Sequence, residues 1–385
     1  MKITADSTQL YKACQAAAKA IPSKTVLPIH EYLLIGADPF EGITIEACND
    51  ADRCFYTLTS ATVEGDDKPL CIQASQLLAI LREIPAQPIT IESEGRTAHI
   101  RWGNDNGKAT LPMEDADLFP NTDFKELAHA VMPITTLRDI HRSVFFAVTE
   151  DELRPIMSSL MLDFSTDGTL VAVGTDGHRL VRYTITDDVT MPTIDDIERK
   201  KVAVPRRASA MLQTFIDETM RSNCEAMIDI AWSGNEVCFS SDKDSVTFRL
   251  AEGRYPNCNS VIPVSSPVNA IVNRTALIGA VRRASALASK TINLVKLTFT
   301  PDTIIVQAED IDFSTSGEEK VPTQMNGADR LVVGLKSNFL LDNLAHIDTE
   351  EIYIEATSES RAVIFTGVDD ERALLMLLMP MQLNN

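Results

Sequence analysis

The chain has 385 residues, of which 44% are hydrophobic and 23% charged, and its formal net charge is −20. This balance is too apolar for a disordered chain and is ordinary for a globular protein of about two to four domains. The amino end lacks the cationic and apolar regions of a signal peptide, and no apolar run approaches the roughly 20 residues of a membrane-spanning helix. Seven scattered cysteines without a CxxC pair argue against a disulfide framework and a zinc site. We therefore expect a cytoplasmic protein with reduced thiols and no membrane contact.

Six short amphipathic helices are predicted along the chain, each preceded by a strand-like run. In chain order they cover residues 7–24, 74–84, 135–145, 206–216, 273–290 and 336–346. Their starts lie roughly 60 to 70 residues apart, a fixed spacing that indicates a repeated structural unit.

Short alternating strands follow each helix and are separated by turn residues. The turns are predicted near Gly42, Gly95, Gly168, Gly234, Asp302 and Ser360. The Asn106-Gly107 pair predicts a type I′ hairpin. Each unit therefore consists of one strand, one helix and about three antiparallel strands, which places the chain in the α+β class.

Polar, proline-rich segments at residues 118–133 and 260–270 predict the domain boundaries. They divide the chain into three similar domains, 1–127, 128–264 and 265–385, each built of two units. Repeats of this kind either stack into an open array or close into a ring, and the pattern alone leaves both arrangements open.

The predicted helix segments carry an excess of positive charge. They contain 13 Lys or Arg and only three acidic residues, so they sum to +10 and the remainder of the chain carries −30. A basic face on an acidic protein predicts a surface that binds a polyanion such as nucleic acid. The acidic remainder has two interpretations, general solubility or an outer surface that repels nucleic acid.

No sequence motif predicts catalysis, a metal or a cofactor. Walker A, GxGxxG and HExxH patterns are absent, and the six histidines are dispersed. Asp176 and His178 lie close together in GTDGHRLVRY, but a turn between two strands is a better interpretation than a hydrolytic or metal-assisted pair. The carboxyl end, ALLMLLMPMQLNN, is expected to form a core strand followed by an apolar tail. Beside the TDGHRL turn, that tail would complete a small peptide-binding cleft.

Several strings together resemble one known family. ELRPIMSSLMLDF, GTDGHRLVRY, VAVPRR, LAEGRYPNCNSVIP and the terminal LMPMQL follow the order and spacing of the β sliding clamps of bacterial DNA polymerase III. The resemblance implies the DNA clamp fold and a head-to-tail homodimeric ring whose helices line a hole for duplex DNA. It also implies a non-catalytic processivity factor without a cofactor, which binds double-stranded DNA independently of sequence. The replicative polymerase and the clamp loader would bind it through short peptide motifs.

The resemblance also implies a cleft for partner peptides between the second and third domains. Its residues by position are Arg154, Met157, Thr175, Gly177, His178, Arg179, Leu180, Pro256, Val261, Met379, Pro380, Met381 and Leu383. Gln382 stands where many members carry a basic residue, and Pro155 and Ile156 stand where some carry aromatic residues.

The charge pattern supplies the candidates for a DNA-facing surface. They are Lys12, Lys19, Lys24, Arg82, Arg142, Arg206, Arg207, Arg282 and Arg283. An alternative is a clamp-fold paralogue that binds peptide motifs as a scaffold and does not slide on DNA. The positive charge of the helices argues against it, because a protein that does not bind DNA has little reason to separate its charges.

Overall fold

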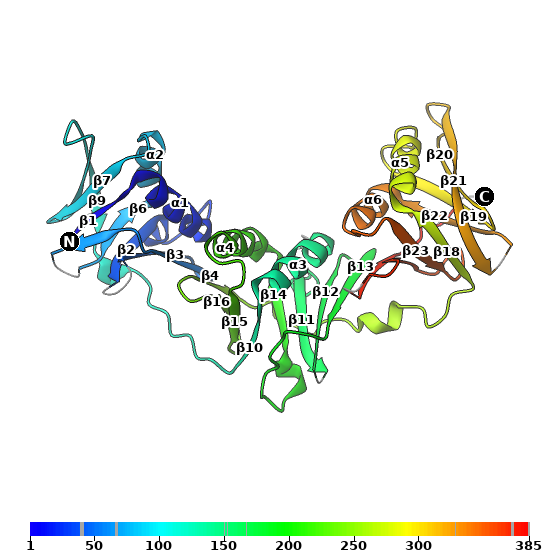
Figure 1. Cartoon of the computed structure of the whole chain (residues 1–385), viewed down its shortest axis with the longest axis horizontal. Helices are drawn as coiled ribbons and strands as arrows, with labels where there is room; N and C mark the ends of the chain where they lie inside the picture. Colours follow the sequence, from blue (N-terminus) through cyan, green and yellow to red (C-terminus); the bar gives the residue numbers. More distant parts are fainter. Residues whose placement is uncertain are drawn as a thin grey trace. The chain divides into compact units, whose positions relative to one another are not determined.

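The computed structural model describes residues 1–38, 42–65, 68–149, 151, 153–166, 168–327, 329–370 and 373–383. It divides into two compact units, Met1–Arg138 with Asp188–Leu250 and Asp139–Asp187 with Ala251–Asn385. Both units combine antiparallel sheets with short helices (Figure 1). The α+β class predicted from the sequence is therefore confirmed. None of the helices formed by the described residues has the length and apolar character needed to cross a membrane.

The first two repeats follow the predicted order of strand, helix and three strands. The first comprises β1 (Lys2–Asp6), α1 (Ser7–Ala17), β2 (Tyr32–Asp38), β3 (Gly42–Cys48) and β4 (Asp52–Leu58). The second comprises β6 (Leu70–Gln73), α2 (Ala74–Glu83), β7 (Pro88–Glu94), β8 (Thr97–Trp102) and β9 (Gly107–Glu114). A short extra strand, β5 (Thr62–Glu64), lies between them.

The third and fourth repeats have the same order. The third comprises β10 (Ala128–Pro133), α3 (Ile134–Val144), the 3-10 turn η4 (Phe145–Ala147), β11 (Ser159–Thr166), β12 (Thr169–Thr175) and β13 (Arg179–Ile185). The fourth comprises β14 (Lys201–Pro205), the 3-10 turn η6 (Arg206–Ala208), α4 (Ser209–Ser222), β15 (Met227–Trp232), β16 (Glu236–Ser240) and β17 (Ser245–Arg249).

The last two repeats complete the series of six in the described chain. The fifth comprises β18 (Val268–Asn273), α5 (Arg274–Ser285), β19 (Leu294–Thr300), β20 (Thr303–Asp310) and β21 (Thr315–Gly327). The sixth comprises β22 (Leu331–Lys336), α6 (Ser337–Ala345), β23 (Glu351–Ala356), β24 (Val363–Gly367) and β25 (Leu374–Leu378). The predicted sixfold repeat is confirmed.

Neighbouring repeats exchange their leading strands. In the first unit the strands run β10-β15-β16-β17-β4-β3-β2-β6-β9-β8-β7-β1-β5, so that β1 pairs with β7 and β6 pairs with β2. In the second unit β18 pairs with β23 and β22 pairs with β19. Because each leading strand completes the sheet of its neighbour, two repeats are needed to form one layered body.

The helices pack in pairs and bury an apolar stripe against the sheets. In α1 the buried stripe includes Leu10, Cys14 and Ala17, at the three- to four-residue spacing of one helix face. Asp6 begins this helix by accepting hydrogen bonds from the backbone amides of Thr8 and Gln9, both at 3.0 Å. The pairs α1 with α2 and α5 with α6 lie side by side (Figure 1).

Two local predictions differ from the structure. The β8–β9 hairpin exists, but Trp102 pairs with Gly107, so the loop is residues 103–106 and the two-residue type I′ turn at Asn106-Gly107 is wrong. The positive φ angles lie at Gly103, Asn104 and Asp105 instead. Helix ends also differ: the helix predicted to end at residue 216 continues as α4 to Ser222, whereas those predicted to end at 24 and 290 end as α1 at Ala17 and as α5 at Ser285.

Candidate functional site

The TDGHRL turn connects β12 to β13 and is held by its own polar side chains. Asp176 Oδ1 accepts hydrogen bonds from the amides of His178 (2.9 Å) and Arg179 (2.8 Å). Thr175 Oγ1 donates to the Arg179 carbonyl (2.6 Å) and accepts from the Gly177 amide (3.1 Å). Gly177 has a φ of +84°, which a residue with a side chain adopts only with strain. The carboxylate of Asp176 thus stabilises the turn, in agreement with the structural interpretation of the Asp176–His178 pair.

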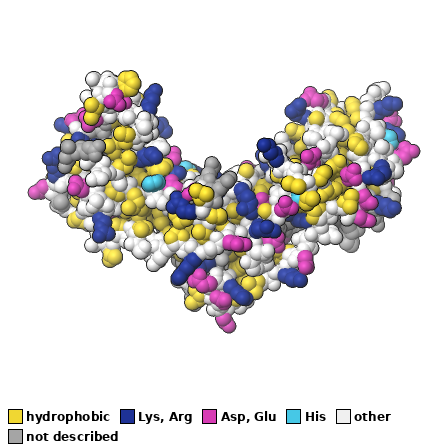
Figure 2. All heavy atoms as spheres, turned by 180° about the vertical axis from the view of Figure 1, so that it is seen from behind, with side chains coloured by type: hydrophobic (Ala, Val, Ile, Leu, Met, Phe, Trp, Pro, Cys, Tyr) yellow, Lys and Arg dark blue, Asp and Glu magenta, His cyan; other side chains and the backbone are white. Residues whose placement is uncertain are grey.

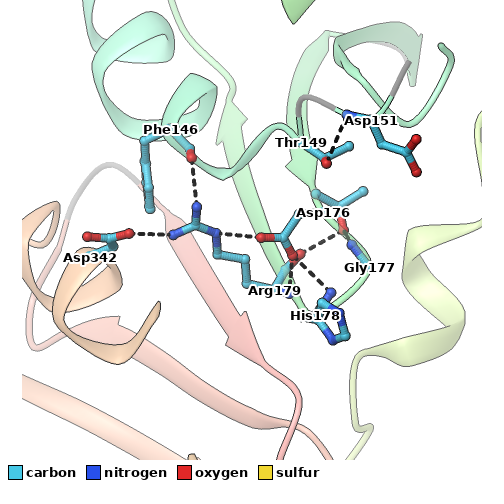
Figure 3. Close-up of polar contacts among 9 residues, drawn as sticks. Phe146, Thr149, Asp151, Asp176, Gly177, His178, Arg179 and Asp342 are labelled. Carbon is cyan, nitrogen blue, oxygen red and sulfur yellow. Dashed lines mark hydrogen bonds and ion pairs between the residues drawn. The ribbon is translucent and has the colours of Figure 1, made fainter. Parts of the chain in front are cut away.

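The Arg179 side chain fixes this turn to two other segments (Figure 3). Its guanidinium donates to Asp176 Oδ2 (3.0 Å), to Asp342 Oδ2 of α6 (2.9 Å) and to the Phe146 carbonyl of η4 (3.0 Å). It also lies over the rings of Phe146 and Phe339, at 5.2 and 4.7 Å from their centroids. Only 10% of this side chain is exposed, so Arg179 positions the turn more than it presents a charge to solvent.

The apolar tail after β25 lies against the same turn. β25 pairs with β13, with Leu378 opposite Arg179, and Pro380 follows the end of the strand. The Met379 amide donates to the His178 carbonyl at 2.8 Å. Met379 keeps 38% of its surface exposed, and His178 is also exposed. The predicted core strand with an apolar tail beside TDGHRL is therefore what the chain forms.

Two loops also border the TDGHRL turn, one around residues 149–157 and one around residues 255–261. The Thr149 amide donates to the Thr175 carbonyl (3.3 Å), and Arg154 pairs with Asp151 at 2.9 Å. The Arg154 guanidinium and the Leu153 amide lower the pKa of Asp151. The methyl group of Met157 approaches Gly177, at 4.0 Å from the position of a built Cβ.

The second loop carries Pro256 and Val261. The Tyr255 hydroxyl donates to the Val173 carbonyl (3.3 Å), and Arg182 Nη1 donates to Asn259 Oδ1 (3.3 Å). These bonds place the loop beside β12 and β13, while Pro256 and Val261 themselves are exposed. Of the cleft residues, Thr175 and Leu180 are buried, at 5% and 3% exposure, so they support the turn rather than contact a ligand.

Three residues that complete this site were not identified from the sequence. Phe146, Phe339 and Asp342 surround Arg179, and the Phe339 ring also stacks with His178 at a centroid distance of 6.2 Å. Asp342 is 163 residues from Arg179 along the chain. The one available signal was that Phe339 and Asp342 are three residues apart, which places both on one face of a helix.

The basic candidates lie on or beside the helices, as predicted. Lys12, Lys19, Lys24, Arg82, Arg142, Arg207, Arg282 and Arg283 are exposed, and Arg206 is half-buried. Ion pairs join Arg82 to Glu83 (3.0 Å), Arg142 to Asp348 (2.9 Å), Arg207 to Asp52 (3.1 Å) and Arg283 to Glu319 (2.6 Å). Figure 2 shows Lys and Arg side chains interspersed with Asp and Glu side chains over the face drawn.

Ion pairing distinguishes two sets of four among these basic candidates, apart from Arg206. The Glu319 carboxylate raises the pKa of Arg283, and the guanidinium in turn lowers the pKa of Glu319. A phosphate would have to compete with that carboxylate. Lys12, Lys19, Lys24 and Arg282 are exposed, and the described residues give none of them a carboxylate within ion-pair distance. In the described part of the chain, no group of three or more His, Cys, Asp or Glu side chains is arranged to hold a metal ion.

Comparison with known proteins identifies the family. Three family models of the DNA polymerase III beta subunit match the chain: the N-terminal domain at residues 1–123, the central domain at 131–257 and the C-terminal domain at 259–382. The beta sliding clamp of Bacillus subtilis is 26% identical over 395 residues, covering 99% of this chain and all of that protein. The beta sliding clamp of Synechococcus elongatus is 26% identical, with both chains fully covered.

Solved structures agree with the fold. The DNA polymerase sliding clamp of Bacillus subtilis matches with a TM-score of 0.88 at 24% identity, and that of Pseudomonas aeruginosa with 0.88 at 20%, both over the full length of each chain. These matches confirm the clamp fold expected from the sequence strings. The chain belongs to the DNA polymerase III beta subunit family, the bacterial beta sliding clamps.

Proposed function

We propose that two copies of this chain close head to tail into a ring that encircles duplex DNA. The ring would tether the replicative polymerase to its template and so confer processivity. The observation that carries this proposal is the sixfold strand–helix–strands repeat, with exposed cations on or beside the helices. It is supported by the family assignment. The domain boundaries we propose remain 1–127, 128–264 and 265–385.

Two strand edges support the head-to-tail contact. Residues 107–112 of β9 pair with β8, and β6 pairs only with Met113 and Glu114 of β9 in the described sheet. Residues 315–322 of β21 pair with β20, and β18 takes over only from Thr323 onwards. Each strand thus keeps a stretch with one unpaired edge, and such edges add strands from another chain. Lys108 on β9 and Glu318 on β21 are both exposed and carry opposite charges.

The ring is tested by its mass in solution. A closed dimer gives about twice the chain mass of 42.3 kDa, independent of concentration in the micromolar range. A monomer at that concentration, or open-ended growth, would contradict the closed ring. A glutamate at Lys108 should weaken the dimer, whereas a glutamine at the same position controls for loss of the charge alone.

We propose further that the duplex passes over the basic candidates without base-specific contacts. Lys12, Lys19, Lys24 and Arg282 would supply the main phosphate contacts, since they are exposed and are not paired with a described carboxylate. Such contacts carry no sequence information and weaken with salt. A ring that slides must not hold any one position tightly, and the ion-paired arginines are suited to such loose contact.

The cleft formed by the TDGHRL turn, the tail and the two bordering loops is proposed to bind partner proteins. Polymerase and clamp loader would each insert a short extended peptide with leucine or phenylalanine anchors. The exposed Met379, His178, Pro256 and Val261 would contact those anchors, while Arg179 holds the turn in place. No catalytic step and no cofactor is proposed for this chain.

A further inference from the structure

The tail of the chain is tethered at two points. The Met379 amide donates to the His178 carbonyl, and two residues later the Met381 amide donates to the Gly334 carbonyl, both at 2.8 Å. Pro380, between them, has no amide hydrogen to donate. Met381 and Gly334 form an antiparallel bridge, so the tail adds a short strand segment to β22. One side of the cleft is therefore made by a segment that few hydrogen bonds hold.

Gly334 lies inside β22, opposite Lys296 of β19, where its backbone belongs to the regular ladder. What distinguishes this position is the lack of space. A Cβ built on Gly334 would lie 2.7 Å from Leu383 Cδ2, 3.1 Å from Leu294 Cδ1 and 3.1 Å from the Met381 carbonyl oxygen. The tail side chain and the tail backbone thus both occupy the volume that a side chain at residue 334 would need.

We propose that Gly334 is a positioning residue for the partner cleft. Its missing side chain lets Leu383 and the Met381 segment seat against β22, so that the tail is in place before a partner peptide arrives. When the tail is already ordered, the peptide binds without the entropy cost of ordering the tail during association. This inference rests on the proposed function of the cleft and assigns a role to a residue that does not itself contact the peptide.

An alanine at residue 334 would displace the tail rather than β22. The ladder with β19 holds β22 over its whole length, from Leu294 opposite Lys336 to Phe299 opposite Leu331. Among the described residues, the tail is held to β22 by the hydrogen bond from the Met381 amide. The nearest obstacle is the end of the Leu383 side chain, which can rotate away, but the Met381 carbonyl must also shift by a few tenths of an ångström. The Met381–Gly334 hydrogen bond should then lengthen or break.

The experiment compares Gly334→Ala with Gly234→Ala. Gly234 lies between β15 and β16 in the first unit, and a Cβ there meets nothing within 4 Å. Calorimetry uses a synthetic extended peptide with leucine and phenylalanine anchors, and hydrogen exchange follows the Met381 amide. We expect Gly334→Ala to weaken the peptide about three- to tenfold, the effect of one lost hydrogen bond. The Met381 amide should exchange faster by a similar factor, and Gly234→Ala should change neither.

A second variant distinguishes displacement of the tail by the alanine side chain from a general loss of stability. In a Leu383→Ala background the nearest obstacle is gone, so the further Gly334→Ala change should cost less affinity than it does in the wild type, although the Met381 carbonyl still has to shift. Fully additive losses, unchanged Met381 exchange in Gly334→Ala, or tighter peptide binding by that variant would overturn the inference. Tighter binding would mean that the tail competes with the peptide. If the wild type does not bind the peptide, the cleft proposal fails as well. Exchange of the Met381 amide in Gly334→Ala still shows whether residue 334 positions the tail.

Discussion

Replacement of Arg179 by methionine tests whether the network around this residue holds the cleft. Methionine keeps most of the length and the apolar stem and removes every N–H donor of the guanidinium. The change therefore deletes three charged hydrogen bonds and two ring contacts without creating a large cavity.

The expected loss follows from the burial of each partner. Arg179 and Asp176 are 10% and 12% exposed, so removing one of them breaks a nearly buried pair, which typically costs about 3–5 kcal/mol. Asp176 still accepts hydrogen bonds from two backbone amides, so the cost of losing the Arg179–Asp176 pair should lie near the lower end of this range. Asp342 is 53% exposed, and its pair adds at most about 1 kcal/mol. The free energy of opening this region should fall by about 3–4 kcal/mol in total.

Native-state hydrogen exchange at the amides of His178 and Leu180 measures this loss locally, and peptide calorimetry measures its effect on the cleft. Asp342→Asn is the matched control, because it removes only the exposed pair and should cost at most about 1 kcal/mol. If Arg179→Met opens with a free energy within about 1 kcal/mol of wild type, the network does not hold the turn and the reasoning is refuted.

Three further predictions concern the rest of the molecule. Burial raises the pKa of Asp244, whose Oδ1 accepts the Thr57 amide at 2.9 Å, so the folded state favours the protonated form and stability falls as pH rises through the folded-state pKa. Asp244→Asn keeps an acceptor without the charge, so urea unfolding at pH 7 should find it at least as stable as wild type, with the difference closing in acid; a less stable variant at pH 7 would contradict this. On linear DNA, a glutamine at Lys12, Lys19, Lys24 or Arg282, none of which has a carboxylate partner among the described residues, should reduce the slope of log affinity against log salt by about 0.9. A glutamine at an ion-paired arginine should reduce the slope by clearly less, and equal reductions would show that the ion pairs do not matter. Deletion from Met379 to the end of the chain should abolish peptide binding and leave the dimer mass unchanged, and undiminished affinity in calorimetry would remove the tail from the cleft.

Much of the fold could be predicted because it repeats. The six copies of one repeat predicted the six helices and most of the turns between strands. A weak pattern in one copy had little effect on the prediction, because the other five copies showed the same order. The hairpin itself was predicted, but the position of its turn was wrong, because Asn106-Gly107 is a strong local signal while the register of β8 and β9 places Trp102 opposite Gly107. Pairing over the whole strand outweighed the preference of two residues.

The candidate site was predictable only in part. The TDGHRL turn and the tail are contiguous strings, so the sequence placed them correctly. Asp342 and Gly334 contribute through contacts that join segments far apart in the chain, and neither residue type is unusual at its position. The charge sums of the helix segments also did not include neighbouring carboxylates. Glu319 and Asp348 lie outside those segments and pair with Arg283 and Arg142 inside them.

The most direct test of the account is retention on circular DNA. The protein is loaded on nicked circular duplex by a clamp loader and then filtered at a salt concentration that abolishes binding to linear DNA. A closed ring predicts that the protein stays on the circle at high salt and leaves when a restriction enzyme linearises it, because the linkage is topological while the phosphate contacts are weak. Release by salt from the intact circle, or retention after linearisation, would contradict the sliding ring.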